Sequence, residues 1–168
     1  RKYLAPGLFG PCGYGFPSII GAKIGNPETP VVGFAGDGAF GISMNEMTAI
    51  GRSEWPGITM IIFRNYQWGA EKRNSTLWYD DNFVGTELDL QVSYADIAEA
   101  CGVNGVQVRT MEALTSELKN AVKNQMEHGK TTFLEVILNQ ELGDPFRRDA
   151  MTTPVPVAGV SKDDMCPQ

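Results

Sequence analysis

The sequence predicts an α/β fold in which a mostly parallel sheet is flanked by helices. Short apolar runs alternate along the chain with stretches whose apolar residues recur at helical spacing. Strands that alternate with helices in this way pair in parallel and bring the helices onto the faces of the sheet. The 168 residues are enough for one domain with its own core. We therefore expect one domain, 1–145, followed by a C-terminal tail, 146–168.

The first helices are expected on either side of the first strand. A glycine-rich segment, 10–21, leads into an apolar stretch, and Pro17 suits the first turn of a helix that we expect at 16–25. The next helix is indicated by four apolar residues that recur every three or four positions and so share one face: Phe40, Met44, Met47 and Ile50.

Four strands are expected, at 30–35, 58–63, 105–109 and 132–138, and the first two are apolar runs that read as buried. Two further helices are expected, one at 94–101 that Gly102 closes, and one marked by Leu114, Leu118, Ala121 and Val122. Residues 64–92 are polar and aromatic without a clear period. A connection of this length is usually a structured loop with a function.

Composition and charge argue against several classes of protein. The 14 basic and 20 acidic residues give a net charge of −6, which disfavours a nucleic-acid-coating role. No apolar run approaches the roughly 18 residues that span a bilayer, and no secretory leader is visible. The single histidine, His128, lies in a predicted turn, so a catalytic triad or a histidine-rich metal site has no members.

The three cysteines are odd in number and far apart: Cys12, Cys101 and Cys166. No CxxC pair is present, so neither a zinc site nor a disulfide framework is expected. We expect reduced thiols and a cytoplasmic location. Because the chain opens on Arg1 rather than Met, we also expect it to be a piece of a longer protein.

The tripeptide Gly36-Asp37-Gly38 follows the first strand and opens the next helix. Glycines let the backbone turn sharply and approach a ligand, and the N–H groups at a helix start suit a phosphate. Asp37 is an odd anion beside a phosphate unless a cation bridges the two. A hard cation such as Mg²⁺ prefers carboxylate, amide and phosphate oxygens.

Asn65 follows the second strand almost at once, and 26 residues separate it from Gly38. That interval accommodates one helix and a returning strand, and a β–α–β unit places both strand ends on the same edge of the sheet. Asp37 and the Asn65 amide oxygen can then meet on one metal ion, with a loop carbonyl just past Asn65 as a third ligand. A Gly-Asp-Gly tripeptide alone is often an ordinary turn, so the prediction depends on the whole combination.

The tripeptide and the segment 63–69 (FRNYQWG) resemble the diphosphate-binding half of thiamine-diphosphate enzymes, the superfamily of acetohydroxyacid synthase and pyruvate decarboxylase. The resemblance implies the thiamine-diphosphate-binding fold, with thiamine diphosphate and Mg²⁺ as cofactors. It implies that Asp37 and Asn65 bind Mg²⁺ through their side chains and Gln67 through its carbonyl. The superfamily often has two consecutive Asn, where this chain has Arg64 and then Asn65.

The same resemblance implies the residues that hold the cofactor. Gly38 and Ala39 would bind the diphosphate through backbone N–H groups. The other cofactor-binding positions implied by these two segments are Gly36, Asn65, Trp68 and Gly69.

The loop 10–17 (GPCGYGFP) resembles the superfamily segment that lies beneath the cofactor. By that resemblance the Gly10 carbonyl accepts a hydrogen bond from the aminopyrimidine ring, and Cys12 takes the place of the bulky residue that bends the cofactor. Cys is smaller than the usual Leu, Ile or Met. The alternative for Cys12 is a small buried apolar filler.

Longer segments resemble the sulfoacetaldehyde acetyltransferase family within this superfamily: 3–25, 31–42, 63–89 and 139–151. The resemblance implies the C-terminal third of an enzyme that converts sulfoacetaldehyde and phosphate to acetyl phosphate and sulfite. The alternatives are another decarboxylase or synthase, acting on sulfopyruvate or pyruvate, and a non-catalytic cofactor-binding module. A generic nucleotide-binding domain is disfavoured because neither GxGxxG nor a P-loop motif is present.

The substrate, the acceptor and the leaving group of that reaction are anions, so positive groups are expected near the cofactor. The candidates for holding the sulfonate or the phosphate are Lys72, Arg73, Arg147 and Arg148. The alternative is a solvated charge cluster. The aromatic residues of 66–90 are expected either to form a lid or wall over the site or simply to anchor the loop: Trp68, Trp78, Tyr79 and Phe83.

No catalytic residue is expected in this chain. The superfamily's activating Glu comes from a separate pyrimidine-binding domain, and Glu46, Glu71 and Glu87 do not lie in that motif, so they are expected to be surface carboxylates. The expected partners are a pyrimidine-binding domain of the same or another chain and further copies of this chain, with no nucleic acid and no membrane. Alone, the chain should be a cofactor half-site.

Overall fold

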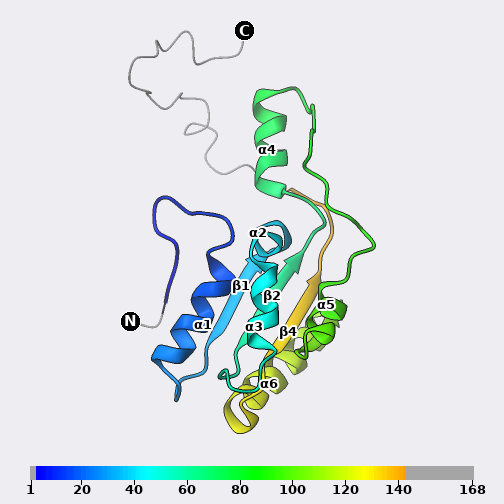
Figure 1. Ribbon diagram of the computed structural model, residues 1–168. Helices are drawn as coiled ribbons and strands as arrows, with labels where there is room; N and C mark the ends of the chain where they lie inside the picture. The colour runs from blue at the N-terminus through cyan, green and yellow to red at the C-terminus, as the bar shows by residue number, and fades with distance from the viewer. Residues whose placement is uncertain (1–2, 143–168) are drawn as a thin grey trace. The chain divides into compact units, whose positions relative to one another are not determined.

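A computed structural model describes residues 3–142, apart from the side chains of Leu77 and Trp78. In that part of the chain four parallel strands form one sheet in the order β1-β2-β4-β3 (Figure 1). The strands are β1 (Val32–Gly36), β2 (Thr59–Arg64), β3 (Asn104–Val108) and β4 (Thr132–Ile137). The helices are α1 (Gly15–Gly25), α2 (Asp37–Ile42), α3 (Met47–Ile50), α4 (Gly69–Trp78), α5 (Tyr94–Ala100) and α6 (Met111–His128), with a 3₁₀ turn, η1 (Met44–Glu46). The predicted α/β fold with a parallel sheet is confirmed.

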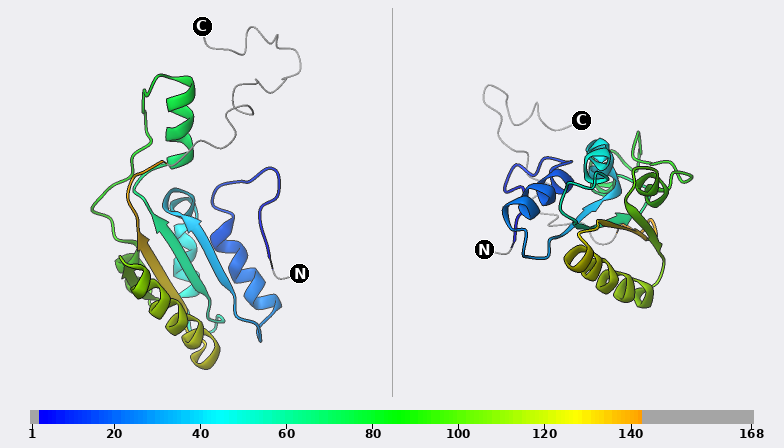
Figure 2. Two further views of the ribbon diagram at one scale, coloured as in Figure 1. Left: turned by 180° about the vertical axis from the view of Figure 1, so that it is seen from behind. Right: turned by 60° about the horizontal axis from the view of Figure 1, so that its bottom comes forward.

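The sheet has an apolar core on each face, because alternate residues of a strand point to opposite sides. On one face, Met60 and Ile62 of β2 pack with residues from α1, α2, α3 and α5. On the other face, Ile61 of β2 and Leu134 of β4 pack against Ala121 and its neighbours on α6. Figure 2 shows α6 on the opposite side of the sheet from α2 and α3. The helices therefore cover both faces, as expected for a parallel sheet.

Local signals in the sequence set the ends of the helices. The Thr110 hydroxyl accepts a hydrogen bond from the Ala113 N–H at 3.1 Å and caps the start of α6. Gly129 ends α6 with φ = 63°, a left-handed conformation that glycine adopts at low cost. The Ser93 hydroxyl caps α5 in the same way through the Asp96 N–H.

The prediction of one continuous helix around 40–50 is wrong. The segment divides into α2, η1 and α3, with a break at Ser43, whose φ and ψ are −116° and 17°. The Ser43 N–H bonds to the Phe40 carbonyl at 3.0 Å, which tightens the end of α2. Phe40, Met47 and Ile50 still reach one core, at 1%, 1% and 6% exposure. The spacing of the apolar residues thus predicted which side chains are buried, but it did not predict the break at Ser43.

The expectation of a loop throughout 64–92 is also wrong in part, because α4 lies inside it. This helix has no apolar stripe, so its residues show no period that predicts a helix. Two of its side chains bond back to the preceding turn, Ser75 to the Glu71 carbonyl at 3.1 Å and Thr76 to the Lys72 carbonyl at 3.4 Å.

The described chain forms two compact units. The first comprises residues 3–66 together with Leu88–Asn139 and contains the whole sheet; the second comprises Gln67–Glu87 and residues 140–142. The second unit has its own internal pairing, in which the Trp68 N–H bonds to the Thr86 carbonyl at 2.7 Å. The predicted tail, 146–168, lies outside the described residues.

Candidate functional site

Asp37 stands where β1 ends and α2 begins. Gly36 pairs with Phe63 in the register of β1 and β2, so the segment that follows β2 emerges beside Asp37. The Asp37 carboxylate is 1% exposed, and its two oxygens accept N–H bonds from two directions: Oδ1 from Gly38 at 2.9 Å and Oδ2 from Tyr66 at 2.7 Å. The Tyr66 bond brings Asp37 together with the segment that contains Asn65, as the sequence predicted.

Asn65 is half-buried between two residues that both contact Asp37. Tyr66 has φ = 61°, a left-handed conformation that is unusual for a side-chain-bearing residue. Such a conformation persists when surrounding contacts hold it, and residues of this kind cluster at functional sites. The backbone therefore adopts an unusual conformation at Tyr66, next to Asn65, where its N–H bonds to Asp37.

The charge of Asp37 is costly where it lies. Burial raises the pKa of its carboxyl above the ordinary value of 3.8, while the N–H groups of Tyr66 and Gly38 and the charge of Arg64 act in the opposite direction. A bound cation would favour the charged form of this carboxylate. A buried carboxylate fits a hard cation, whose ligands are oxygens.

Arg64 belongs to this site, although the sequence indicated it only as the residue before Asn65. Its side chain is 1% exposed at the end of β2, with Nη1 3.3 Å from Asp37 Oδ2 and Nε 3.6 Å from Glu135 Oε1. We call Asp37, Arg64 and Glu135 the buried charge cluster. The available signal was an Arg directly after the apolar run 58–63 and a Glu within the run 132–138, because charged residues are rarely buried unless they are paired.

The α2 end of the site contains the glycines that the sequence singled out. Gly38 is buried and Ala39 half-buried in the first turn of α2. The Gly38 N–H is already used by Asp37 Oδ1. A Cβ at Gly36 would meet nothing within 4 Å, so this position leaves space above the end of β1.

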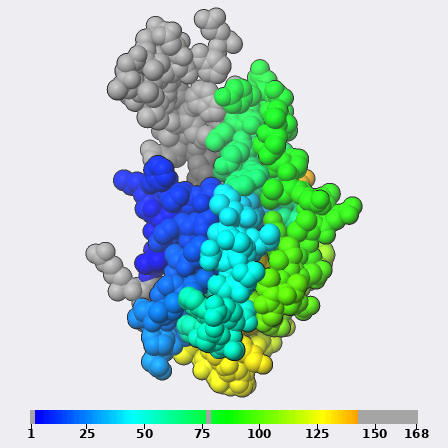
Figure 3. Space-filling view, viewed as in Figure 1, coloured from blue at the N-terminus to red at the C-terminus, as the bar shows by residue number. Residues whose placement is uncertain are grey.

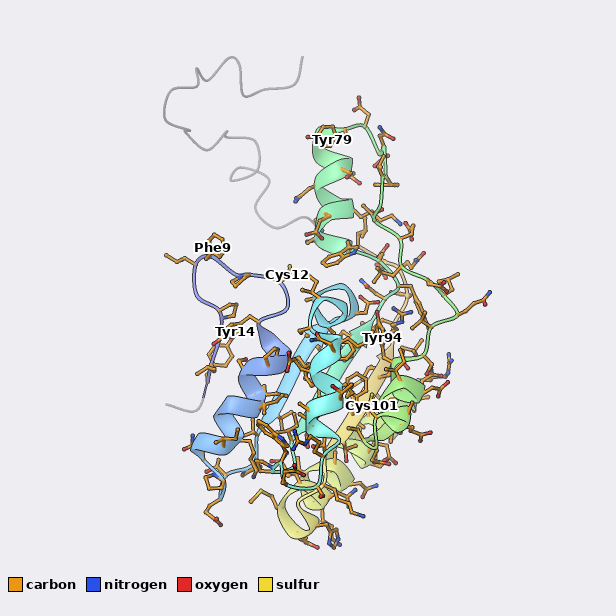
Figure 4. The ribbon with its side chains drawn as sticks, viewed as in Figure 1. Phe9, Cys12, Tyr14, Tyr79, Tyr94 and Cys101 are labelled. Carbon is orange, nitrogen blue, oxygen red and sulfur yellow. The ribbon has the colours of Figure 1, made fainter. Side chains whose placement is uncertain are left out.

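The glycine-rich loop before α1 lies at the surface (Figure 3). Gly10 and Gly13 have φ of 54° and 88°, conformations that favour glycine and give the loop its sharp course. Figure 4 shows Phe9, 91% exposed, pointing outward from the tip of this loop and Cys12 on the limb that returns toward α1. Cys12 is exposed, so the alternative of a buried apolar filler is wrong.

In the second unit, Gln67 is 2% exposed and is held by its own neighbours. Its Nε2 donates to the Gln140 carbonyl at 2.9 Å, and its Oε1 accepts from Lys72 Nζ at 3.1 Å. Trp68 and Gly69 form the N-cap and first residue of α4, and both are half-buried.

Two of the basic residues proposed for substrate binding lie on α4. Lys72 pairs with Glu87, contacts Gln67 and lies 5.1 Å from the centroid of the Phe83 ring. Arg73 donates through Nη2 to the Leu142 carbonyl. Lys72 is therefore engaged in pairing rather than solvated alone, and the pKa of Glu87 is lowered, chiefly by its hydrogen bond to Lys72. Arg147 and Arg148 lie outside the described residues.

The remaining acidic and aromatic candidates lie largely at the surface. Glu71 and Glu87 are exposed and Glu46 is half-buried, in line with surface carboxylates. Tyr79 and Phe83 are 59% and 40% exposed. These two rings therefore do not anchor the loop by burial.

Two features are absent from residues 3–142. No group of three His, Cys, Asp or Glu in this range could hold a metal ion. No helix in the same range is long and apolar enough to cross a membrane.

Comparison with known families shows which family the chain belongs to. The family described as "Thiamine pyrophosphate enzyme, C-terminal TPP binding domain" matches residues 1–136. The chain belongs to this family. Membership in a thiamine-diphosphate-binding family agrees with the geometry, because the Asp37 carboxylate and the Asn65 segment converge at one edge of the sheet.

Relatives of this thiamine-diphosphate-binding domain are closely similar in sequence. The chain is 75% identical over all of its length to "Sulfoacetaldehyde acetyltransferase" of Rhodobacter capsulatus and spans 28% of that protein. It is 70% identical over 98% of its length to the protein of the same name from Roseovarius nubinhibens, of which it spans 27%. The mitochondrial "Acetolactate synthase catalytic subunit" of Saccharomyces cerevisiae is 28% identical over 74% of the chain, which spans 18% of it.

A solved structure shows the same fold. The thiamine diphosphate-dependent 4-hydroxybenzoylformate decarboxylase of Rhodococcus jostii matches with a TM-score of 0.63 and 23% identity, over 78% of this chain and 24% of that one. At this identity the likeness concerns the fold alone.

Proposed function

We propose that this chain is the metal- and diphosphate-binding part of an enzyme that converts sulfoacetaldehyde and phosphate to acetyl phosphate and sulfite. The choice of reaction is supported by the 75% and 70% identity to proteins named sulfoacetaldehyde acetyltransferase. The cofactor site is supported by one observation above all, the 2.7 Å bond from the Tyr66 N–H to Asp37 Oδ2. This bond holds the two halves of the motif together.

The proposed metal is Mg²⁺, held by the side chains of Asp37 and Asn65 and by the backbone carbonyl of Gln67. A carboxylate and two neutral oxygens leave positions for the diphosphate and water in an octahedron. Gly38 and Ala39 would present backbone N–H groups to the diphosphate, with Gly36 leaving space for its approach. Because the Gly38 N–H donates to Asp37 in this structure, it would be shared with or transferred to the diphosphate.

The remaining cofactor contacts would come from the surface loop and from α4. The Gly10 carbonyl would accept a hydrogen bond from the aminopyrimidine, and Cys12 would contact the bent cofactor from below. Trp68 and Gly69 would contribute at the start of α4. When bound, thiamine diphosphate supplies the nucleophilic carbon and the electron sink for the reaction.

This chain would contribute positive charge for the anionic substrates. Lys72, Arg73, Arg147 and Arg148 are the proposed ligands of the sulfonate or the phosphate. For Lys72 this requires an exchange, since it is paired with Glu87. An anionic substrate that takes the place of the Glu87 carboxylate keeps the ammonium group compensated.

The acid that activates the cofactor would come from a partner. We propose a pyrimidine-binding domain of the same or another chain, and a homo-oligomeric assembly that brings the two halves together. We further propose a cytoplasmic location, in accord with the unpaired state of Cys12 and Cys101.

Cofactor binding is tested on the 168-residue chain by titration calorimetry and thermal unfolding. Thiamine diphosphate with Mg²⁺ should bind and raise the unfolding midpoint, since a ligand at 100 times its Kd adds about 2.7 kcal/mol of stability. Either component alone should have a much smaller effect. Asp37→Ala should remove the Mg²⁺-dependent part, and an unchanged Mg²⁺ response in that variant contradicts the proposed site.

The reaction is tested by combining the chain with a pyrimidine-binding domain of the same superfamily. Sulfoacetaldehyde and phosphate should then yield sulfite and acetyl phosphate in equal amounts. Release of CO₂ from pyruvate or sulfopyruvate in place of sulfite would favour a decarboxylase or synthase. Cofactor binding without turnover of any of these substrates would favour a non-catalytic module.

A further inference from the structure

Arg64 is fixed on several sides at the centre of the site. Its Nη2 donates to the carbonyls of Asp89 at 2.5 Å and Val92 at 3.1 Å. Its guanidinium carbon lies 4.4 Å from the ring centroid of Tyr66 and 4.5 Å from that of Tyr94. The side chain is 1% exposed, so these contacts replace water entirely. Arg64 therefore connects β2, the segment 89–92 and the start of α5.

Glu135 is held independently of Arg64. Its carboxylate accepts the N–H groups of Tyr94 and Ala95 at 3.2 Å each, and Gln107 Nε2 at 3.3 Å. Glu135 therefore provides a fixed negative charge on β4 against which the guanidinium is oriented. The Nε–Oε1 distance of 3.6 Å makes this an ion pair.

Asp37 depends on Arg64 more directly. Its Oδ2 lies 3.3 Å from Arg64 Nη1 and accepts the N–H of Tyr66, whose ring lies against the same guanidinium. Arg64 thus contacts both residues of the Asp37–Tyr66 hydrogen bond, Asp37 at its carboxylate and Tyr66 at its ring. Asn65 lies between Arg64 and Tyr66 in the chain, so the same contacts fix the backbone that carries it.

We propose that Arg64 is a positioning residue for the metal site, which holds the Asp37 carboxylate and the Asn65–Tyr66 backbone in the arrangement that Mg²⁺ binding requires. The inference rests on the proposed function, in which Asp37 and Asn65 bind the metal. Groups that orient metal ligands in this way change metal affinity about 10- to 100-fold when they are replaced.

Only the planar guanidinium of arginine can make all the contacts of Arg64 at once. One guanidinium donates to two carbonyls, pairs with two carboxylates and lies over two rings, whereas an ammonium is a point charge with three donors. Arg64→Lys therefore keeps the positive charge and removes the planar guanidinium. A substitution that removed the charge would confuse two effects, because the loss of a cation beside the metal would by itself strengthen Mg²⁺ binding. Arg64→Lys keeps the charge, so a change in Mg²⁺ affinity reports positioning alone.

The experiment measures Mg²⁺ affinity of the 168-residue chain by calorimetry at saturating thiamine diphosphate, well below each variant's unfolding midpoint. Mn²⁺ in place of Mg²⁺ gives an electron paramagnetic resonance spectrum that reports the geometry of the site. Arg64→Lys should weaken Mg²⁺ binding about 10- to 100-fold and alter the Mn²⁺ spectrum. Arg52→Lys is the matched control, because Arg52 is exposed and paired only with exposed Glu54 among the described residues, and it should match the wild type.

The outcomes separate the inference from the proposed function. Unchanged Mg²⁺ affinity in Arg64→Lys overturns the inference, even if that variant unfolds at a lower temperature. If Arg64→Lys does not fold, Tyr66→Leu decides: removal of the ring should lower Mg²⁺ affinity several-fold, and no change overturns the inference. If Asp37→Ala loses Mg²⁺ binding while Arg64→Lys binds normally, the positioning role is contradicted and the proposed metal site stands. If the wild type does not bind Mg²⁺, both proposals are contradicted.

Discussion

At the scale of single residues, burial decides what a charge can do in this protein. Asp37, Arg64 and Glu135 are each at most 1% exposed and hold one another in the buried charge cluster. Removing one member of such a group leaves the others without compensation, which costs far more than an exposed pair does. The Lys72–Glu87 pair is more open, with side chains 15% and 55% exposed, so its contact is easier to exchange.

The Glu87 carboxyl provides a pH test of one such exposed contact. Its pKa is lowered, first by the hydrogen bond from Lys72. A carboxyl whose pKa is lower in the folded than in the unfolded state adds stability above the unfolded pKa, and this is lost as the pH falls through the folded pKa. In Lys72→Met, the Glu87 pKa measured by NMR titration should move up toward the ordinary value of 4.5. If the Glu87 pKa does not move, the hydrogen bond from Lys72 does not cause its lowering.

Two glycines provide a matched test of local packing. A Cβ added at Gly105 in β3 would lie 2.1 Å from the Ala95 carbonyl oxygen, a backbone atom of α5 that cannot move aside cheaply. Gly105→Ala should therefore lower the free energy of unfolding by about 1–3 kcal/mol. A Cβ at Gly21, inside α1, would meet nothing within 4 Å, so Gly21→Ala should raise it by roughly 0.5–1 kcal/mol.

Urea unfolding of both glycine variants measures these differences. Equal effects of the two substitutions would contradict the close approach of α5 to β3. A loss of stability in Gly21→Ala would contradict the open environment of α1 at that position.

At the scale of the elements, helices with an apolar face could be predicted from the sequence, and a polar helix could not. The long helix α6 has an apolar face, a Thr before its first residue and a Gly after its last. The helix α4 has no such face, and its side chains satisfy its own backbone instead. Periodicity detects a helix by what it buries against a core, so a helix that buries little goes undetected.

The cap of α6 can be tested with two threonines of the same helix. Thr110→Ala removes the hydroxyl that accepts the Ala113 N–H and should cost about 1 kcal/mol of stability. Thr115 is exposed and bonds only to the Met111 carbonyl among the described residues. Because alanine is the better helix former, Thr115→Ala should be neutral or slightly stabilising. Chemical denaturation compares the two, and equal losses would argue against a specific cap.

At the scale of the whole molecule, the sheet leaves apolar surface uncovered near its β1 edge. Val32 and Phe34 of β1 are 40% and 60% exposed, and Phe63 of β2 is 39% exposed with its ring centroid 6.4 Å from that of Phe34. β1 also has a free edge, since it pairs with β2 alone among the described strands. Exposed apolar patches and free strand edges favour association.

We therefore expect the isolated 168-residue chain to self-associate as its concentration rises. Sedimentation should give a mass above 18.3 kDa, and Phe34→Lys should shift the equilibrium toward the monomer. Met111→Lys, at a side chain that is 71% exposed on α6, is the control and should leave the association unchanged. A monomer at all concentrations would show that this surface does not drive association.

By itself, the sequence determined the order of the strands and helices, most of their limits, and the convergence of Asp37 with the Asn65 segment. These features follow from periodicity, caps and the geometry of a β–α–β unit, all of which act over short stretches of chain. Only the tertiary structure decided the burial and contacts of Arg64, the presence of α4, the break at Ser43 and the exposure of Cys12. The burial of Arg64 and the exposure of Cys12 depend on residues distant in the chain. The helix α4 and the break at Ser43 leave no mark on the spacing of apolar residues, which is the pattern that predicts a helix.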